Sequence, residues 1–198
     1  MQTGAEDGKL IVAFSGRIGS GKTTLARRLV SRHDACHLRS NQVLRSCAAR
    51  DDLGEVIERV VLQRYSAALD RTTGGSWLAE GLEPEVARLP SGSLVIIDAI
   101  RLPEQLARLR EVLEPTVRHV HLRAPGRTLE LRYRLRETEF VELPTYAEVL
   151  ADETEAAVPA MASWADLVID TGELAPHEVE AAFLRWLESL PGRVSDQA

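Results

Sequence analysis

The chain has 198 residues, of which 44% are hydrophobic and 27% are charged, and its 24 Lys and Arg against 30 Asp and Glu leave a net charge of −6. This length favours one domain, and the apolar fraction can build a core, which excludes global disorder and a small disulfide-stapled scaffold. The acidic balance argues against nucleic acid and membrane surfaces as partners, because both attract positively charged proteins.

The N-terminal half of the chain alternates apolar runs with helical patterns. After a polar tail at 1–8, the run at 10–14 is apolar throughout, which is typical of a strand buried on both faces. Glycines end this run, and the apolar spacing that follows predicts a helix over 22–31. Helical periodicity then continues over 41–73 and again over 76–89.

The C-terminal half repeats this alternation. Three more strands are predicted, at 93–98, 117–122 and 165–170. Helices are predicted over 102–113, 128–136, 155–164 and 176–190, whereas 137–154 is polar and irregular and 191–198 is a loose tail. Because apolar strands alternate with helices, we expect a parallel sheet in an α/β fold.

Residues 16–23 read Gly-Arg-Ile-Gly-Ser-Gly-Lys-Thr and fit the phosphate-binding loop G-x-x-x-x-G-K-[ST] in full. The glycines let successive backbone N–H groups point at phosphate oxygens, and the helix that follows adds the positive end of its dipole. We expect Lys22 to contact the β- and γ-phosphate oxygens of ATP, and the Thr23 hydroxyl to bind Mg²⁺. The residues of the loop expected to contact ATP are Gly16, Gly19, Ser20, Gly21, Lys22 and Thr23.

Asp98 ends the predicted strand at 93–98, at the edge of the sheet where ligands bind in doubly wound folds. A carboxylate there can hold Mg²⁺ or accept the proton of a hydroxyl group. The alternative role, an N-cap for the helix at 102–113, would require a residue nearer to that helix. Asp170 also ends a strand, where a structural or capping role is favoured, and we interpret His119 and His121 as structural residues of a strand.

Four stretches in order resemble the adenylate-kinase-like nucleoside monophosphate kinases, over roughly residues 9–172, and the phosphate-binding loop is the first. The second, residues 37–45, is similar to the strand–turn–helix segment of that family, which contains Ser40 here and ends in Leu-Arg. The resemblance implies that this segment, through Arg45, binds the phosphate of the acceptor. The third, residues 97–105, is similar to the family's Asp-Gly-Phe-Pro-Arg stretch, which implies the same role for Arg101.

The fourth stretch is Pro125 followed by Arg132 and Arg136, and the resemblance implies that these arginines lie at the hinge of a lid, over the base and phosphates of the nucleotide. Arg132 and Arg136 share one helical face, which favours an anion or a carboxylate between them. Cations at this place would stabilise the charge that spreads over a transferring phosphate. The alternative is a solvated helix in an arginine-rich protein.

The chain also departs from adenylate kinases. Asn41 and Ala99 stand where that family has glycine, and no arginine follows Arg136 before Arg185, which argues against adenylate as the acceptor. A second resemblance, of residues 59–65 and 77–82 to phage-type deoxynucleoside monophosphate kinases, implies that Gln63 lies near the base of the acceptor. The alternative is that Gln63 is exposed and Trp77 fills the core.

The compartment is indicated by three further features. Cys36 and Cys47 form neither a disulfide framework nor a metal-ligand spacing, which is typical of free thiols in a reducing cytosol. No apolar run approaches the ~18 residues of a membrane span. Residues 1–8 lack the basic start and apolar centre of a signal peptide. We expect a cytoplasmic protein that binds no membrane and no nucleic acid, as a monomer or a homodimer.

Together these features predict a P-loop NTPase fold over residues 1–198, with a doubly wound parallel sheet of five strands flanked by helices. An acceptor-binding helical segment is expected at about 40–90 and a lid at about 126–155. The expected activity is transfer of the γ-phosphate of ATP to a nucleoside or deoxynucleoside monophosphate, with Mg²⁺ on Thr23 and Asp98. The residues expected to act in catalysis are Lys22, Asp98, Arg132 and Arg136. The alternatives are a P-loop kinase for dephospho-coenzyme A or a metabolite hydroxyl, and a nucleotide-binding switch without kinase activity.

Overall fold

The computed structural model describes residues 8–53, 59–113, 117–135 and 145–191. Within them, five strands form one sheet in which every pairing is parallel, in the spatial order β2-β3-β1-β4-β5. The strands are β1 (Leu10–Ser15), β2 (Cys36–Arg39), β3 (Leu94–Asp98), β4 (Arg118–Arg123) and β5 (Leu167–Asp170). This sheet confirms the predicted α/β fold, in which parallel strands are joined by helical crossovers.

The central strand β1 supplies side chains to two cores. Ile11 and Ala13 belong to the core on one face of the sheet, whereas Val12 and Phe14 belong to the core on the other face. All four side chains are fully buried. Because side chains alternate between the faces of a strand, a strand covered on both sides must be apolar at every position, which accounts for the continuous apolar run.

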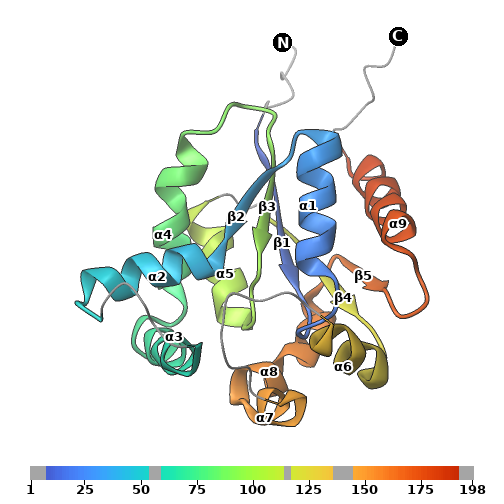
Figure 1. The fold of residues 1–198 in the computed structure, drawn as a ribbon. Coiled ribbons are helices and arrows are strands. Elements are labelled where there is room, and N and C mark those ends of the chain that lie inside the picture. Colours follow the sequence, from blue (N-terminus) through green and yellow to red (C-terminus); the bar gives the residue numbers. More distant parts are fainter. Residues whose placement is uncertain (1–7, 54–58, 114–116, 136–144, 192–198) are drawn as a thin grey trace, which may run out of the picture.

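One face of the sheet is covered by α1 (Lys22–His33) and α9 (Pro176–Glu188), which lie side by side in Figure 1. Phe14 of β1 and Phe183 of α9 meet there edge to face, with ring centroids 5.8 Å apart. Leu25, Ala26 and Leu29 of α1 belong to the same core. This helix is therefore fixed against the sheet by apolar contacts, and its N-terminus lies at the carboxyl edge of the strands.

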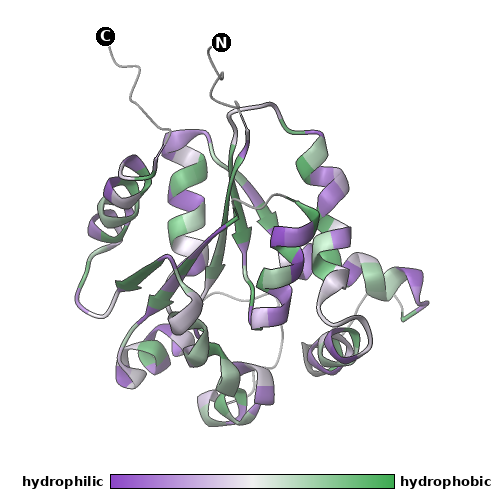
Figure 2. Cartoon of the chain, turned by 180° about the vertical axis from the view of Figure 1, so that it is seen from behind, coloured by the Kyte–Doolittle hydropathy of each residue, from purple (hydrophilic) through white to green (hydrophobic). Residues whose placement is uncertain are grey.

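Four helices cover the other face, namely α2 (Ser40–Arg50), α3 (Arg59–Thr73), α4 (Ser76–Ala87) and α5 (Pro103–Val112). Leu78, Leu82 and Leu106 are buried there beside Ile97 of β3. Seen from behind in Figure 2, the strands are largely apolar, while the helices around them carry hydrophilic residues along part of their surface. The sheet is thus the middle layer of three.

The remaining helices come between β4 and β5 in the sequence, and α6, α7 and α8 lie at the carboxyl ends of the strands (Figure 1). They are α6 (Gly126–Arg134), α7 (Tyr146–Ala151), α8 (Glu153–Ala157) and the 3₁₀-helix η1 (Val158–Trp164). A small apolar cluster joins α6 and α7, in which the rings of Tyr133 and Tyr146 lie 5.6 Å apart. This group covers the edge of the sheet at which the phosphate-binding loop lies.

The prediction of irregular structure over 137–154 is wrong for the described residues 145–154, which contain α7 and the start of α8. The reason is a capping box: the Glu148 N–H donates to Thr145 Oγ1 at 3.2 Å, and the Thr145 N–H donates to Glu148 Oε2 at 2.7 Å. This pairing starts a helix in a segment that has little apolar periodicity. The helical prediction for 155–164 holds, as the end of α8 and η1.

Candidate functional site

The loop between β1 and α1 depends on glycines at two places where the backbone has positive φ. Gly16 has a φ of 138°, and a Cβ there would lie 2.2 Å from the carbonyl oxygen of Leu122. Gly19 has a φ of 81°, and its Cβ would lie 2.7 Å from the carbonyl oxygen of Leu129. A side chain at either position would collide with backbone, so the loop keeps its shape only with glycine. The loop therefore packs tightly against β4 and α6.

Lys22 begins α1 and folds back over this loop. Its Nζ donates hydrogen bonds to the carbonyl oxygen of Gly16 at 2.6 Å and to that of Arg17 at 3.2 Å. Burial lowers the pKa of Lys22, while the negative charges of Asp98 and Glu155 act against that shift. The cation is therefore held in place by two neutral carbonyls and lies near two carboxylates.

Thr23 and Asp98 meet at the carboxyl edge of the sheet. The Thr23 hydroxyl donates to Asp98 Oδ2 at 2.7 Å, and His37 Nε2 lies 3.5 Å from the same oxygen. Burial raises the pKa of Asp98, but His37, Lys22 and Thr23 together keep it below its ordinary value. Asp98 is consequently a carboxylate at neutral pH.

The structure thus brings together the two oxygens expected to hold Mg²⁺. No group of three or more His, Cys, Asp or Glu side chains in the described ranges is arranged to hold a metal ion. Mg²⁺ commonly takes only one or two ligands from a protein and the others from phosphates and water, so the pair Thr23 and Asp98 fits such an ion.

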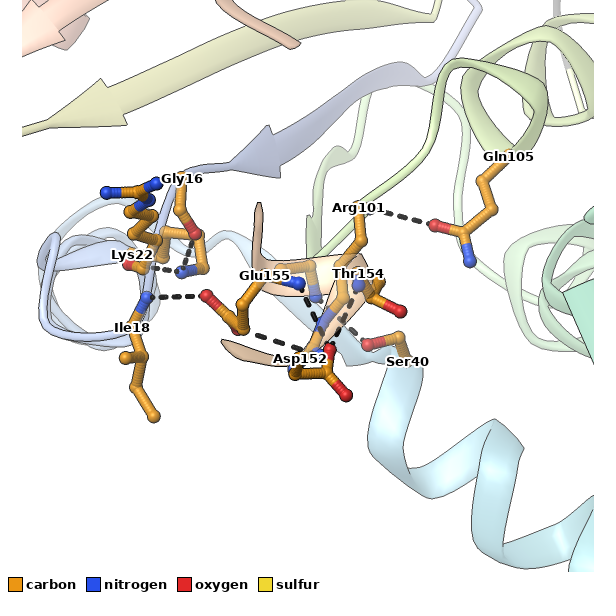
Figure 3. Close-up of polar contacts among 11 residues, drawn as sticks. Gly16, Ile18, Lys22, Ser40, Arg101, Gln105, Asp152, Thr154 and Glu155 are labelled. Carbon is orange, nitrogen blue, oxygen red and sulfur yellow. Dashed lines mark hydrogen bonds and ion pairs between the residues drawn. The ribbon is translucent and has the colours of Figure 1, made fainter. Parts of the chain in front are cut away.

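The side chain of Glu155 in α8 points toward Ile18 of the loop, as Figure 3 shows. Its Oε2 accepts a hydrogen bond of 3.3 Å from the Ile18 N–H, and its Oε1 lies 3.6 Å from Arg101 Nη1. The residue is only 3% exposed. Asp152 caps α8 by accepting hydrogen bonds from the N–H groups of Thr154 and Glu155, which fixes the backbone that carries this carboxylate.

Arg101 is positioned by a chain of hydrogen bonds that leads away from the loop. Its N–H donates to Gln105 Oε1 at 2.8 Å, and Gln105 Nε2 donates to Asp70 Oδ1 at 2.9 Å. Trp77 Nε1 donates to the same oxygen of Asp70 at 2.7 Å. Asp70 of α3 thus joins the buried side chains of Trp77 in α4 and Gln105 in α5 behind the arginine.

Arg132 lies on α6 and contacts the segment after β5. It donates to the Thr171 hydroxyl at 3.0 Å and to the Thr171 carbonyl at 2.7 Å. The Thr171 hydroxyl in turn lies 3.1 Å from the carbonyl oxygen of Ser20 in the loop. Arg132 is therefore fixed beside the loop through Thr171.

A cavity of about 560 Å³ opens between the loop, α6 and the start of α9. Its polar wall includes Lys22, Thr23 and Arg132, and its apolar wall is formed by Ile18, Leu174, Pro176 and Val179. The side-chain oxygen of Ser20 in the loop is buried and has no hydrogen-bond partner among the described residues. An orphaned donor in a loop of backbone N–H groups fits an anionic ligand such as a phosphate.

Behind the loop, three buried polar side chains form a separate cluster. Ser15 Oγ lies 2.7 Å from His119 Nε2 and 2.8 Å from His121 Nδ1. Burial lowers the pKa of both histidines, and that of His121 falls to about 4, with the nearby charges of Lys22 and Arg123 contributing. Both rings are neutral at pH 7, in keeping with the structural role predicted for them.

The other predicted residues lie on the helices beside the sheet. Ser40 accepts a hydrogen bond of 3.1 Å from the Ala99 N–H, so it lies next to Asp98. Arg45 on α2 and Gln63 on α3 are half-buried, and neither makes a hydrogen bond or ion pair with another described residue. Arg136 lies outside the described residues.

Several residues of the site were not predicted. Glu155, Thr171 and Leu174 reach the loop only because β4, β5 and the helices after them fold back over it. One sequence signal was available, since Asp152 followed three residues later by Glu155 is a capping pattern that predicts a helix start there.

In the parts of the chain that the structure describes, no helix is long and apolar enough to span a membrane.

Comparison with known proteins extends this description. The family model for the AAA domain matches residues 11–166. A protein of Dinoroseobacter shibae described as a nucleotide-binding protein is 29% identical over 179 residues, which are 89% of this chain and 50% of that protein. The chain therefore spans about half the length of this curated relative.

Three solved structures are similar in fold. TT1252 from Thermus thermophilus has a TM-score of 0.63 and 21% identity, and the match covers 92% of this chain and 98% of that one. A sugar kinase from Janibacter sp. HTCC2649 has a TM-score of 0.58 and 21% identity over 92% and 96% of the two chains. Shikimate kinase from Acinetobacter baumannii, in complex with shikimate, has a TM-score of 0.57 and 17% identity over 93% and 96%. At these identities the likeness establishes the fold alone.

Proposed function

Because the chain belongs to the AAA domain family, whose model matches residues 11–166, we propose that it is a P-loop phosphotransferase. It transfers the γ-phosphate of ATP to a small-molecule acceptor. The observation that carries this proposal is the hydrogen bond of 2.7 Å between Thr23 and the carboxylate of Asp98, beside the ammonium of Lys22. Phosphoryl transfer needs such a fixed set of a cation and metal-binding oxygens more than it needs covalent chemistry.

On the donor side, the shape and chemistry of the cavity fit ATP. The phosphates would contact the backbone N–H groups of the loop and the side chains of Ser20 and Lys22. The adenine ring would lie against Leu174 and Pro176, where the planar guanidinium of Arg132 can stack on it. Mg²⁺, held by Thr23 and Asp98, neutralises phosphate charge when it is bound.

The residues of the site have distinct roles in this scheme. Lys22 exchanges the carbonyls of Gly16 and Arg17 for phosphate oxygens and stabilises the negative charge that develops on them. Asp98 stays ionised and orients Thr23. The described helices α6 and α7, which belong to the segment predicted as a lid at about 126–155, would exclude water and so limit hydrolysis of ATP.

We further propose a nucleoside or deoxynucleoside monophosphate as the acceptor, bound by the helical segment at about 40–90 and by Arg101. Two half-buried arginines support this. Arg45 has no anionic partner among the described residues, and Arg101 has only the long contact to Glu155 at 3.6 Å. A half-buried guanidinium without a partner is unfavourable, and a phosphate would satisfy it. Gln63 offers both a donor and an acceptor to a base.

A second candidate, a kinase for an acceptor hydroxyl, rests on Asp98 itself. This carboxylate is ionised at neutral pH, so it can accept the proton of an alcohol. The sugar kinase and the shikimate kinase that share the fold have names that indicate such acceptors.

The deciding experiment measures transfer of radiolabelled γ-phosphate from ATP to a panel of acceptors. The panel holds ribo- and deoxynucleoside monophosphates, dephospho-coenzyme A, shikimate and hexoses. We expect a labelled nucleoside diphosphate with one group of monophosphates, and far less product with the Lys22→Ala variant. Label on a hydroxyl compound alone would select the second candidate. ATP hydrolysis without transfer to any acceptor would instead indicate a nucleotide-binding switch.

A further inference from the structure

The carboxylate of Glu155 links two parts of the site that the proposed reaction must bring together. Its Oε2 accepts from the Ile18 N–H in the phosphate-binding loop, and its Oε1 faces the guanidinium of Arg101. A backbone N–H of this loop and an arginine are the donors that proteins use for phosphate oxygens. Glu155, only 3% exposed, thus lies between the Ile18 N–H of the ATP-binding loop and the arginine expected to bind the acceptor, in a position that a phosphate could take (Figure 3).

The direction of the cavity indicates which phosphate this position corresponds to. The apolar wall at Leu174 and Pro176, which suits a base, lies on the side of α9, whereas Glu155 approaches the loop from α8. A triphosphate that extended from this wall across the N-terminus of α1 would reach the Ile18 N–H and Lys22 with its last phosphate. Burial lowers the pKa of Lys22, and the charge of Glu155 acts against that shift, so the carboxylate lies close to the cation that would bind that phosphate.

We propose that Glu155 takes the place of the outermost phosphate in the free protein, and that binding of a nucleoside triphosphate displaces it and releases Arg101 to the acceptor. This inference rests on the proposed function, because it takes ATP as the donor. A carboxylate and a phosphate cannot share the Ile18 N–H, since both are acceptors and both are negatively charged.

The contacts of Glu155 suit a group that leaves its place. Both are long, at 3.3 and 3.6 Å, whereas Lys22 binds Gly16 at 2.6 Å in the same loop. The backbone of α8 is held separately by Asp152. The side chain can therefore turn away from the loop while its helix stays capped.

Two consequences distinguish this arrangement from a purely structural contact. A diphosphate has no third phosphate to place at Ile18, so Glu155 should oppose the binding of ATP but not of ADP. By linkage, an acceptor that draws Arg101 away from Glu155 should also tighten the binding of the triphosphate, and by the same factor in both directions.

Isothermal titration calorimetry of the full chain tests the proposal with Mg²⁺ and either adenylyl imidodiphosphate, a non-hydrolysable triphosphate, or ADP. Glu155→Gln keeps the size of the side chain and removes its charge. We expect this variant to bind the triphosphate about 5- to 20-fold more tightly than the wild type, within the usual range of coupling between sites. Its affinity for ADP should stay within about twofold, because ADP does not reach the position of Glu155.

Glu153→Gln is the matched control, because it removes an exposed charge from the same helix, and both of its affinities should equal those of the wild type. Glu155→Asp withdraws the charge from Ile18 by one methylene group, so it should tighten triphosphate binding as well and provides the test if Glu155→Gln does not fold. Unchanged or weaker triphosphate binding in the folded variants, or an equal gain for ADP, would overturn the proposal. These titrations contain no acceptor, so their outcome is separate from that of the transfer assay.

Discussion

The hydroxyl of Thr23 and the carboxylate of Asp98 are joined by a hydrogen bond of 2.7 Å, although 75 positions separate them in the sequence. The register of the sheet is the cause, because β1 and β3 pair in parallel with Phe14 beside Asp98. Both strands therefore end at the same edge, where the loop after β1 turns into α1. The relationship places two hard oxygen ligands side by side, as Mg²⁺ prefers.

Asp98→Asn should lower Mg²⁺-dependent turnover much more than it lowers nucleotide binding. Asparagine has the size of aspartate and can still accept the hydrogen bond of Thr23, but it lacks the charge that holds a cation. The measurement is a Mg²⁺ titration of turnover, with nucleotide affinity determined in parallel. If the two metal titrations coincide, Asp98 has a structural role only.

Lys22→Ala should reduce phosphate transfer by ~10²- to 10³-fold, because one preorganised cation on the transferring group contributes about 3–4 kcal/mol. The fold should persist, since the Lys22 ammonium binds only carbonyls of the loop among the described residues. Lys9→Ala, at the only other lysine of the chain, is the control and should keep wild-type turnover. Circular dichroism verifies folding, and near-normal turnover of the folded Lys22→Ala protein would contradict a role for the loop in catalysis.

Arg45→Ala should raise KM for the monophosphate acceptor by ~10- to 100-fold, the loss of one charge-assisted pair worth about 1.5–3 kcal/mol. KM for ATP should hardly change, because a separate loop binds the donor. Arg45→Lys should recover only part of the loss, since a point charge does not replace a planar fork.

The control for Arg45 is Arg50→Ala, at an exposed arginine of the same helix, which should leave both KM values as they are. An acceptor KM that does not move in Arg45→Ala would rule out a phosphate contact at this position. It would favour the second candidate, in which the acceptor is an alcohol.

The stability of the protein should fall between pH 7 and pH 5 because of His121. Unfolded histidine takes up a proton near pH 6.5, but the buried ring of His121 does so only at about 4. Between these values the unfolded state binds more protons, so acid favours unfolding and the contribution is complete only above pH 6.5. For these pKa values the expected loss from pH 7 to pH 5 is about 2 kcal/mol.

His121→Asn separates this effect from that of the carboxylates. Asparagine can keep the hydrogen bond of Nδ1 to Ser15 without titrating, so the difference in unfolding free energy between pH 7 and pH 5 should shrink by about 2 kcal/mol. His177→Asn, at an exposed histidine of α9, is the control. Urea unfolding at both pH values gives the measurement, and an unchanged difference in the His121 variant would place the acid sensitivity elsewhere.

The parts of the site that could be predicted from sequence are those that one continuous segment encodes. Gly16 to Thr23 form a loop whose shape follows from its own glycines, and Asp98 is recognised because it ends an apolar run. The parallel sheet followed from the same runs, since strands buried on both faces are apolar throughout. β2 has only four residues, with a histidine and an arginine among them, so it was expected from family resemblance alone.

Glu155 and Thr171 could not be predicted, because their roles depend on how distant elements pack. Glu155 contacts Ile18, 137 positions away, and Thr171 contacts Ser20, 151 positions away. In the sequence one is an acid in a polar segment and the other a threonine after a strand. Only the packing of α6, α7 and α8 over the end of the sheet gives them a partner.

The order of the strands in the sheet also determines how the protein is made. β1 leaves the ribosome first among the strands, but it pairs only with β3 and β4, which end at Asp98 and Arg123. At ~5–20 residues per second, the roughly 80 residues between β1 and the end of β3 take on the order of 4–16 s to synthesise. Throughout that interval the apolar segment Ile11–Phe14 has no neighbouring strand. The nascent chain therefore carries an unpaired hydrophobic strand for seconds, and its sheet begins to assemble only after Asp98 at the end of β3 has been translated.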